Sequence, residues 1–145
     1  MFKHILVATD GSTLADKAVA CALQLDPTAR LSALLVMPDY DLAGFARATF
    51  TNGPDAAGLR RHLAAEGRKQ LDTALARHGP AAQRIERLVA VNDRPYAEIV
   101  ETATRERCDL IVMARHGHGP VVAALLGSQT ARVLALSSVP VLVLP

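Results

Sequence analysis

Short apolar runs and helical patterns alternate strictly along this chain of 145 residues. Five runs are rich in aliphatic or β-branched residues and have the length of strands, and amphipathic segments lie between them. The runs are His4–Thr9, Leu31–Met37, Ile85–Val91, Leu110–Ala114 and Val139–Leu144. The first, fourth and fifth are almost continuously apolar, which is typical of strands buried on both faces of a sheet. This alternation predicts an α/β fold with a parallel sheet, right-handed crossovers and helices on both faces.

The amphipathic segments start and stop at recognisable signals. Ser12 or Thr13 is expected to cap the first helix, and a Gly-Pro pair after His78 ends the second. The third helix is expected to begin at Pro95, and the fourth to span Ser128 to Leu136. The residues expected to be buried on these helices are Leu14, Ala18, Ala22, Leu25, Leu59, Leu63, Leu71, Ala74, Leu75, Tyr96, Ile99, Val100, Ala103, Val133, Leu134 and Leu136.

Length and composition favour one compact domain over residues 1–145 with an aliphatic core, because half of the residues are hydrophobic and only 3% are aromatic. The formal charge of +2 is not gathered into a basic run, so nucleic acid is not expected as the main partner. Cys21 and Cys108 are expected to be reduced thiols of a cytoplasmic protein, and no apolar stretch is long enough to span a membrane. The segment Pro38–Gly58 fits no period and is expected to be a long surface loop that could act as a lid.

A carboxylate follows the first predicted strand. Val7-Ala-Thr-Asp10-Gly11-Ser12 reads as a strand that turns into a helix. In an open α/β sheet, ligands bind beyond the carboxyl ends of the strands, so Asp10 is a candidate for binding sugar hydroxyls or a metal ion. The alternative is that Asp10 and Ser12 only cap the first helix.

A second constellation joins the fourth strand to the fourth helix. Ala114-Arg-His-Gly117 is followed, after nine residues, by Gly127-Ser128. Gly117 lets backbone approach a ligand, and Gly127 and Ser128 are expected to place free N–H groups and a hydroxyl at a helix N-terminus, where they suit phosphate oxygens. If the sheet order is 3-2-1-4-5, both constellations leave adjacent strands and face one crevice. A carboxylate at one end and amide donors at the other suit a nucleotide. The pair His116 and His118 lacks a further obvious ligand, and no metal site is predicted.

These segments resemble the universal stress protein family across essentially the whole chain, through VATDGS, LIVMARHG, GSQTARVL and SSVPVLVLP. The ATP-binding members carry G-x2-G-x9-G-[ST], which is matched here by Gly117, Gly127 and Ser128, whereas Ala114 stands at the first glycine position. Alanine costs about 1–2 kcal/mol there only where the backbone needs a positive φ; otherwise its methyl group crowds the ribose. We expect binding to survive with altered affinity or nucleotide choice.

The resemblance implies a Rossmann-like fold of the adenine nucleotide alpha hydrolase type, which binds ATP, with Mg²⁺ as a candidate companion of the nucleotide. It implies that Asp10 contacts the ribose side with Ala8 and Thr9 nearby, and that main chain around Met37 lies against the adenine. The residues that it assigns to the phosphates are Gly117, Gly127, Ser128, Gln129 and Thr130. It also implies a homodimer formed through the terminal strand Val139–Leu144.

The functional prediction is a nucleotide-binding stress-response regulator or adaptor. Slow ATP hydrolysis is the first alternative, although no G-x4-GK[ST] loop, nearby lysine or evident base supports it. The second alternative is a related interaction module that has lost its nucleotide, which only Ala114 favours. An enzymatic activity is therefore left open, with binding preferred over turnover.

Overall fold

The structure, a computed structural model, describes residues 1–39, 56–115 and 127–145. Five parallel strands form one sheet in the order β3-β2-β1-β4-β5. The strands are β1 (His4–Ala8), β2 (Arg30–Met37), β3 (Glu86–Val91), β4 (Leu110–Ala114) and β5 (Val141–Leu144). The α/β fold predicted from the alternation of apolar runs and helical patterns is therefore confirmed, and so is the strand order on which the proximity of the two constellations depended.

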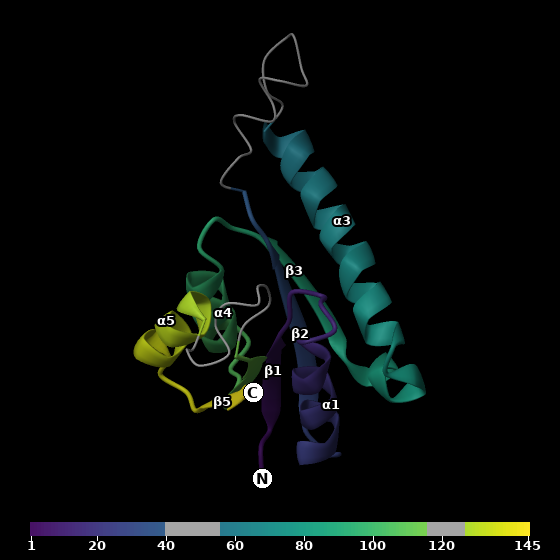
Figure 1. Cartoon of the computed structure of the whole chain (residues 1–145), viewed down its shortest axis with the longest axis vertical. Helices are drawn as coiled ribbons and strands as arrows, with labels where there is room; N and C mark the ends of the chain where they lie inside the picture. The colour runs from purple at the N-terminus through teal and green to yellow at the C-terminus, as the bar shows by residue number, and fades with distance from the viewer. Residues whose placement is uncertain (40–55, 116–126) are drawn as a thin grey trace.

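Helices cover both faces of this sheet (Figure 1). They are α1 (Asp16–Leu25), α3 (Ala56–Ala76), α4 (Pro95–Arg105) and α5 (Ser128–Leu136), with a 3₁₀ helix at Gly79–Arg84. The core residues of α1 and α3 pack on one face, whereas those of α4 and α5 pack on the other. Because all five strands are parallel, their carboxyl ends lie at one edge of the sheet.

Side chains of β1 alternate between the two halves of the core. Ile5 and Val7 pack among the residues of the α1–α3 side, whereas Leu6 and Ala8 pack on the α4–α5 side. All four are buried, as is typical of a central parallel strand covered on both faces. Burial on both faces explains why the first run is apolar at every position rather than at every second one.

Four leucines expected in the core are exposed, namely Leu14, Leu25, Leu134 and Leu136, which are 41–58% accessible. The stripes that the helices bury are narrower than expected and centre on Ala18, Val19 and Ala22 in α1 and on Val133 in α5. Leu14 precedes α1 altogether, because that helix begins at Asp16 with Ala15 in the N-cap position. The expected caps Ser12 and Thr13 were therefore wrong.

The terminal strand is shorter than the predicted Val139–Leu144, because β5 begins at Val141. The Ser137 hydroxyl donates to the Val139 carbonyl at 2.7 Å and accepts from the Val139 N–H at 3.1 Å, so Val139 belongs to a turn. Pairing with β4 starts at the carbonyl of Pro140, which accepts from the Ile111 N–H at 3.0 Å. Pro140 itself has no N–H to donate.

Most of the predicted loop Pro38–Gly58 lies outside the described residues, so the expectation of a lid lies there too. Its last three residues are helical, because α3 already begins at Ala56. Within the described ranges, no helix is long and apolar enough to cross a membrane.

Candidate functional site

The turn after β1 holds Asp10 in a defined orientation. Its Oδ1 accepts from the Ser12 N–H at 2.9 Å, and the Thr9 Oγ1 accepts from the Gly11 N–H at 3.1 Å. Gly11 has a φ of 81°, a left-handed conformation that glycine adopts without the strain of a Cβ. The two short hydrogen-bonded loops turn the chain sharply off β1 and leave Asp10 exposed at the strand's carboxyl end.

An ion pair ties the start of α1 to the end of α3 and supports the same turn. The Arg77 guanidinium donates to both carboxylate oxygens of Asp16 at 2.8 Å and to the Gly11 carbonyl at 2.8 Å. Hydrogen bonding from Arg77 is the main cause that holds the pKa of Asp16 below its usual value, against the opposing effect of burial. The position of the Asp10 turn therefore depends on a contact with α3.

The carbonyl of Arg115 joins the end of β4 to the start of α5. It accepts from the Gly127 N–H at 3.1 Å and from the Thr130 hydroxyl at 2.8 Å. The prediction that Gly127 offers a free amide is therefore wrong, because that N–H is already used. Gly127 takes the N-cap position, and the amides of the following first turn, which begins at Ser128, have no partner within the helix.

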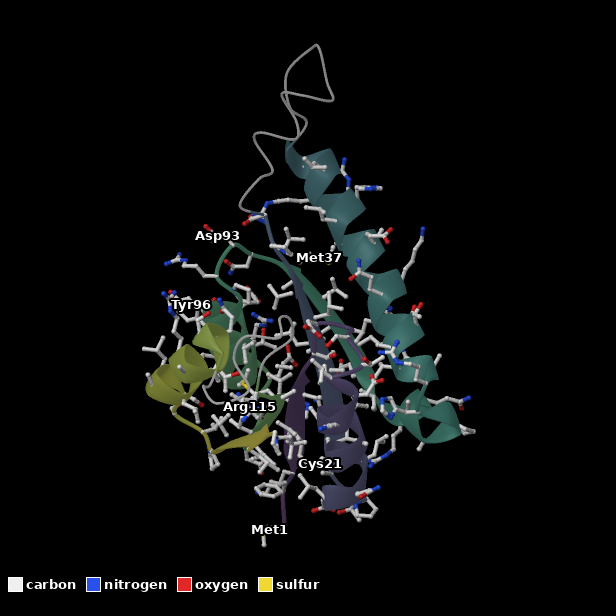
Figure 2. All side chains as sticks on the ribbon, viewed as in Figure 1. Met1, Cys21, Met37, Asp93, Tyr96 and Arg115 are labelled. Carbon is white, nitrogen blue, oxygen red and sulfur yellow. The ribbon has the colours of Figure 1, made fainter. Side chains whose placement is uncertain are left out.

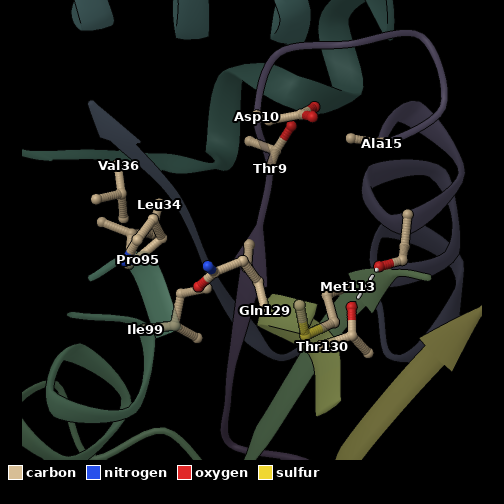
Figure 3. A pocket seen from close by; sticks show the side chains of 12 residues that line it. Thr9, Asp10, Ala15, Leu34, Val36, Pro95, Ile99, Met113, Gln129 and Thr130 are labelled. Atoms are coloured by element: carbon tan, nitrogen blue, oxygen red, sulfur yellow. Dashed lines mark hydrogen bonds between the residues drawn. The ribbon is translucent and has the colours of Figure 1, made fainter. Parts of the chain in front are cut away.

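These two constellations meet in one cavity of about 200 Å³ on the α4–α5 side of the sheet, beyond the carboxyl ends of β1, β2 and β4. Figure 3 shows Thr9 and Asp10 at one side, Gln129 and Thr130 at another, and an apolar wall from β2 and α4. The lining consists of Ala8, Thr9, Asp10, Ala15, Leu34, Val36, Pro95, Ile99, Met113, Ala114, Gln129 and Thr130. The cavity lies where the chain order of the sheet reverses, between β1 and β4, which is where open α/β sheets bind ligands.

Six of the residues predicted for the site line this cavity: Ala8, Thr9, Asp10, Ala114, Gln129 and Thr130. Three others, Met37, Gly127 and Ser128, do not. Gly117 lies outside the described residues, as do His116 and His118. Ser128 is exposed as the first residue of α5, so its hydroxyl is not part of the cavity wall.

Met37 ends β2 with its side chain on the opposite face of the sheet from the cavity. It packs against Gly67 of α3 (Figure 2), and its carbonyl accepts from the Asn92 N–H at 2.9 Å. The neighbouring Val36 faces the cavity instead. Side chains alternate along a strand, so Leu34 and Val36 of β2 line the site whereas Met37 belongs to the other half of the core.

The sequence interpretation missed Ala15, Leu34, Val36, Pro95, Ile99 and Met113. They are the apolar part of the wall. Alternation along β2 and the position of Pro95 at the first turn of α4 are the signals that could have placed Val36 and Ile99 there. Residues of the packed core show the same two patterns. Only the assembled fold therefore distinguishes residues that line the cavity from residues that are buried in the core.

Ala114 stands in ordinary strand conformation. It pairs with Leu144 of β5, and among the described non-glycine residues only Arg107 has a positive φ. The alanine at the first position of the glycine motif therefore carries no backbone strain. Its methyl group lines the cavity and takes up space that a glycine would leave open.

The family model described as the universal stress protein family matches residues 1–145. The chain belongs to the universal stress protein family. A universal stress protein of Thermus aquaticus, named for its place in the QAH/OAS sulfhydrylase 3' region, is 34% identical over 149 residues, which cover 98% of each chain.

Two solved structures extend this comparison. The hypothetical protein MJ0577, solved as a structure-based assignment of biochemical function, superposes with a TM-score of 0.79 at 25% identity, over 99% of this chain and 96% of that one. A universal stress protein in complex with cAMP superposes with a TM-score of 0.59 at 24% identity, over 99% and 96% of the two chains. The fold of this universal stress protein is therefore shared with the family's solved members.

Proposed function

We propose that this universal stress protein is a single-domain cytoplasmic regulator that binds an adenine nucleotide, with ATP as the expected ligand. The observation that carries the proposal is the cavity at the place where the chain order of the sheet reverses, between β1 and β4. The Asp10 carboxylate and the first turn of α5 both line it. A universal stress protein of the same fold was solved with cAMP, so this fold can hold an adenine nucleotide.

The two sides of the cavity suit the parts of a nucleoside. Leu34, Val36, Pro95 and Ile99 form an apolar wall that suits the flat faces of a purine ring. Asp10 is acceptor-only when ionised, so it suits the ribose hydroxyls, which donate, and it repels a phosphate placed directly against it. The base therefore lies toward α4, and the ribose lies toward β1.

The phosphates are assigned to the connection between β4 and α5. The amides of the first turn of α5 point out of the helix, and its macrodipole favours negative charge at that end. Thr130 serves to fix this turn to Arg115. Gly117, Ser128 and the main-chain amide of Gln129 keep their proposed place from the family motif. The Gly127 N–H is taken by the Arg115 carbonyl, so Gly127 would contribute only a close approach of the backbone. Mg²⁺ would be carried by the phosphate oxygens, and within the described residues no cluster of three or more His, Cys, Asp or Glu forms a site for it.

Binding is favoured over hydrolysis by the chemistry of the lining. Among the described lining residues Asp10 is the one carboxylate, and none is a lysine, arginine or histidine. Phosphoryl transfer depends on positive charge and on an oriented water or base near the phosphate, and Asp10 lies on the ribose side. The protein is therefore proposed to act through its nucleotide-bound state.

The proposed homodimer uses the terminal segment Val139–Leu144. Strand β5 is at the edge of the sheet, and its four residues, Val141 to Leu144, are only partly buried. An apolar edge strand is stabilised when a second copy covers it. Sedimentation equilibrium should give twice the chain mass of 15.4 kDa, and a monomer at micromolar concentration would contradict the dimer.

The binding proposal is tested by titrating the protein with a fluorescent ATP analogue and by calorimetry with ATP, each with Mg²⁺ and with a chelator. Wild-type protein should bind, and Asp10→Ala should bind at least about ten-fold more weakly, because a charged hydrogen bond contributes about 1.5–3 kcal/mol. Asp93→Ala is the matched control, since Asp93 follows β3 at the same edge of the sheet but does not line the cavity.

Three outcomes would contradict this proposal. Equal affinity of the Asp10→Ala and Asp93→Ala proteins would remove the ribose assignment. No binding by wild-type protein would favour an interaction module without nucleotide. Steady release of ADP, measured in the same samples, would support the slow ATPase instead.

A further inference from the structure

Gln129, the second residue of α5, has its side-chain amide fixed by another helix. Its Oε1 accepts from the main-chain N–H of Tyr96 in α4 at 2.9 Å. A backbone N–H can only donate, so the oxygen of the amide must face Tyr96 and the nitrogen must face away. The orientation of this amide therefore follows from its partner.

The contact replaces a missing helix cap. Arg94, at the N-cap position of α4, makes no side-chain cap, and Pro95 has no N–H. Gln129 satisfies the next amide, that of Tyr96, from α5. The Arg132 guanidinium lies 4.9 Å from the centre of the Tyr96 ring, so a second contact from α5 holds the same residue. Figure 2 places Tyr96 where α4 and α5 meet.

The other polar side chains of the cavity are used differently. The Thr130 hydroxyl donates to the Arg115 carbonyl, and the Asp10 carboxylate can only accept when ionised. The Thr9 Oγ1 lies with Asp10 at the end of β1. Among the described lining residues, Gln129 brings a polar side chain to the apolar side of the cavity. Figure 3 shows its amide reaching toward Pro95 and Ile99.

We propose that Gln129 is a specificity-determining residue, whose Nε2 donates a hydrogen bond to an acceptor atom on the edge of the bound base. The inference rests on the proposed function and adds to it the atom that reads the base. Because Oε1 is committed to Tyr96, the amide cannot rotate to accept from an exocyclic amino group without uncapping α4. The site therefore selects bases that present a ring nitrogen or a carbonyl oxygen at this edge.

Two variants separate recognition from capping. Gln129→Glu keeps an acceptor for the Tyr96 N–H but loses the donor, whereas Gln129→Met of similar length loses both. We expect Gln129→Glu to unfold at a temperature no lower than that of the wild type, because a carboxylate is favourable at a helix N-terminus. Gln129→Met should unfold at a lower temperature. Both should bind adenosine about five-fold more weakly, the usual range for one hydrogen bond.

The decisive measurement is a double-mutant cycle in which one change is made in the protein and the other in the ligand, with affinities measured by calorimetry. Adenosine has three acceptor nitrogens on its rings, N1, N3 and N7, and 1-deaza-, 3-deaza- and 7-deaza-adenosine each lack one of them. None of the four ligands carries a phosphate that the new carboxylate of the Gln129→Glu protein could repel. One of the three analogues should bind the wild-type protein about five-fold more weakly than adenosine binds it. The same analogue and adenosine should bind the Gln129→Glu protein with equal affinity.

The possible failures are distinct. If wild type binds adenosine and ATP but every deaza analogue is weakened equally in both proteins, the role of Gln129 is refuted while the proposed function stands. If wild type binds neither adenosine nor ATP, the proposed function is refuted and this inference with it.

Discussion

Gly67 of α3 lies directly against Met37 of β2: a Cβ built on Gly67 would stand 2.8 Å from the Met37 Cγ and 2.7 Å from the Val89 Cγ1. Helix α3 approaches the sheet so closely there that a hydrogen atom is all that fits. This contact sets the distance between α3 and β2, and with it the position of the strand whose other face lines the cavity.

Gly67→Ala should destabilise the protein. Overpacking of this kind costs about 1–3 kcal/mol, while replacing glycine by alanine in a helix returns about 1 kcal/mol, so we expect a net loss of about 1 kcal/mol. Urea unfolding followed by circular dichroism measures it. In a Val89→Ala background the loss should become smaller, because the Cγ1 atom has gone while the Met37 Cγ at 2.8 Å remains; an unchanged loss would show that the close approach to Val89 is not a cause.

Ala114→Gly restores the first glycine of the family motif. Since Ala114 lies in a strand with no positive φ, the substitution relieves no strain and should cost about 0.5–1 kcal/mol of stability. Only one methyl group leaves the cavity wall, so the Kd for ATP should change by no more than about four-fold. Calorimetry of the two proteins checks this, and a change of a hundred-fold would mean that the alanine governs binding.

The ion pair between Asp16 and Arg77 should make stability depend on acid pH. Hydrogen bonding from Arg77 lowers the pKa of Asp16 in the folded protein below the ordinary aspartate value of 3.8. The stabilisation is therefore fully present above about pH 4 and is lost as the pH falls through the lower folded pKa. Denaturant unfolding from pH 7 to pH 2 should show a shallower acid loss for Asp16→Asn than for wild type.

The control for that series is Asp93→Asn, which removes an exposed carboxylate that lies 3.8 Å from Arg94. Its curve should run parallel to the wild-type curve. If the curve of the Asp16→Asn protein also runs parallel to the wild-type curve, the loss of stability in acid comes from other carboxylates.

The two thiols should differ in reactivity. Cys108 is 5% accessible, and burial raises its pKa to about 11, so little thiolate is present at pH 8. Cys21 is partly exposed in α1. Alkylation at pH 8 followed by mass spectrometry should label Cys21 first and Cys108 only as fast as the protein unfolds. Rapid labelling of a Cys21→Ser protein under native conditions would be inconsistent with a buried Cys108.

Alternation of apolar runs and helical stripes was enough to predict the parallel sheet and the bounds of β4 and α5. These features follow from local periodicity and from the handedness of crossovers, which act within a few dozen residues. The same patterns put Asp10 and the Gly127-Ser128 start of α5 at one edge of the sheet, because all parallel strands end there. The exposed Leu136 shows the limit, since periodicity finds an apolar residue but not whether anything covers it.

Tertiary structure alone decided which side chains form the wall of the cavity and how its polar groups are used. Val36, Ile99 and Gln129 come from three elements far apart in the sequence and meet only after the helices have packed. The hydrogen bond between Gln129 and the Tyr96 N–H arises in the same way, between two helix starts. Local sequence determines the conformation of each segment, whereas contacts between segments depend on the packing distances and register that the whole core sets.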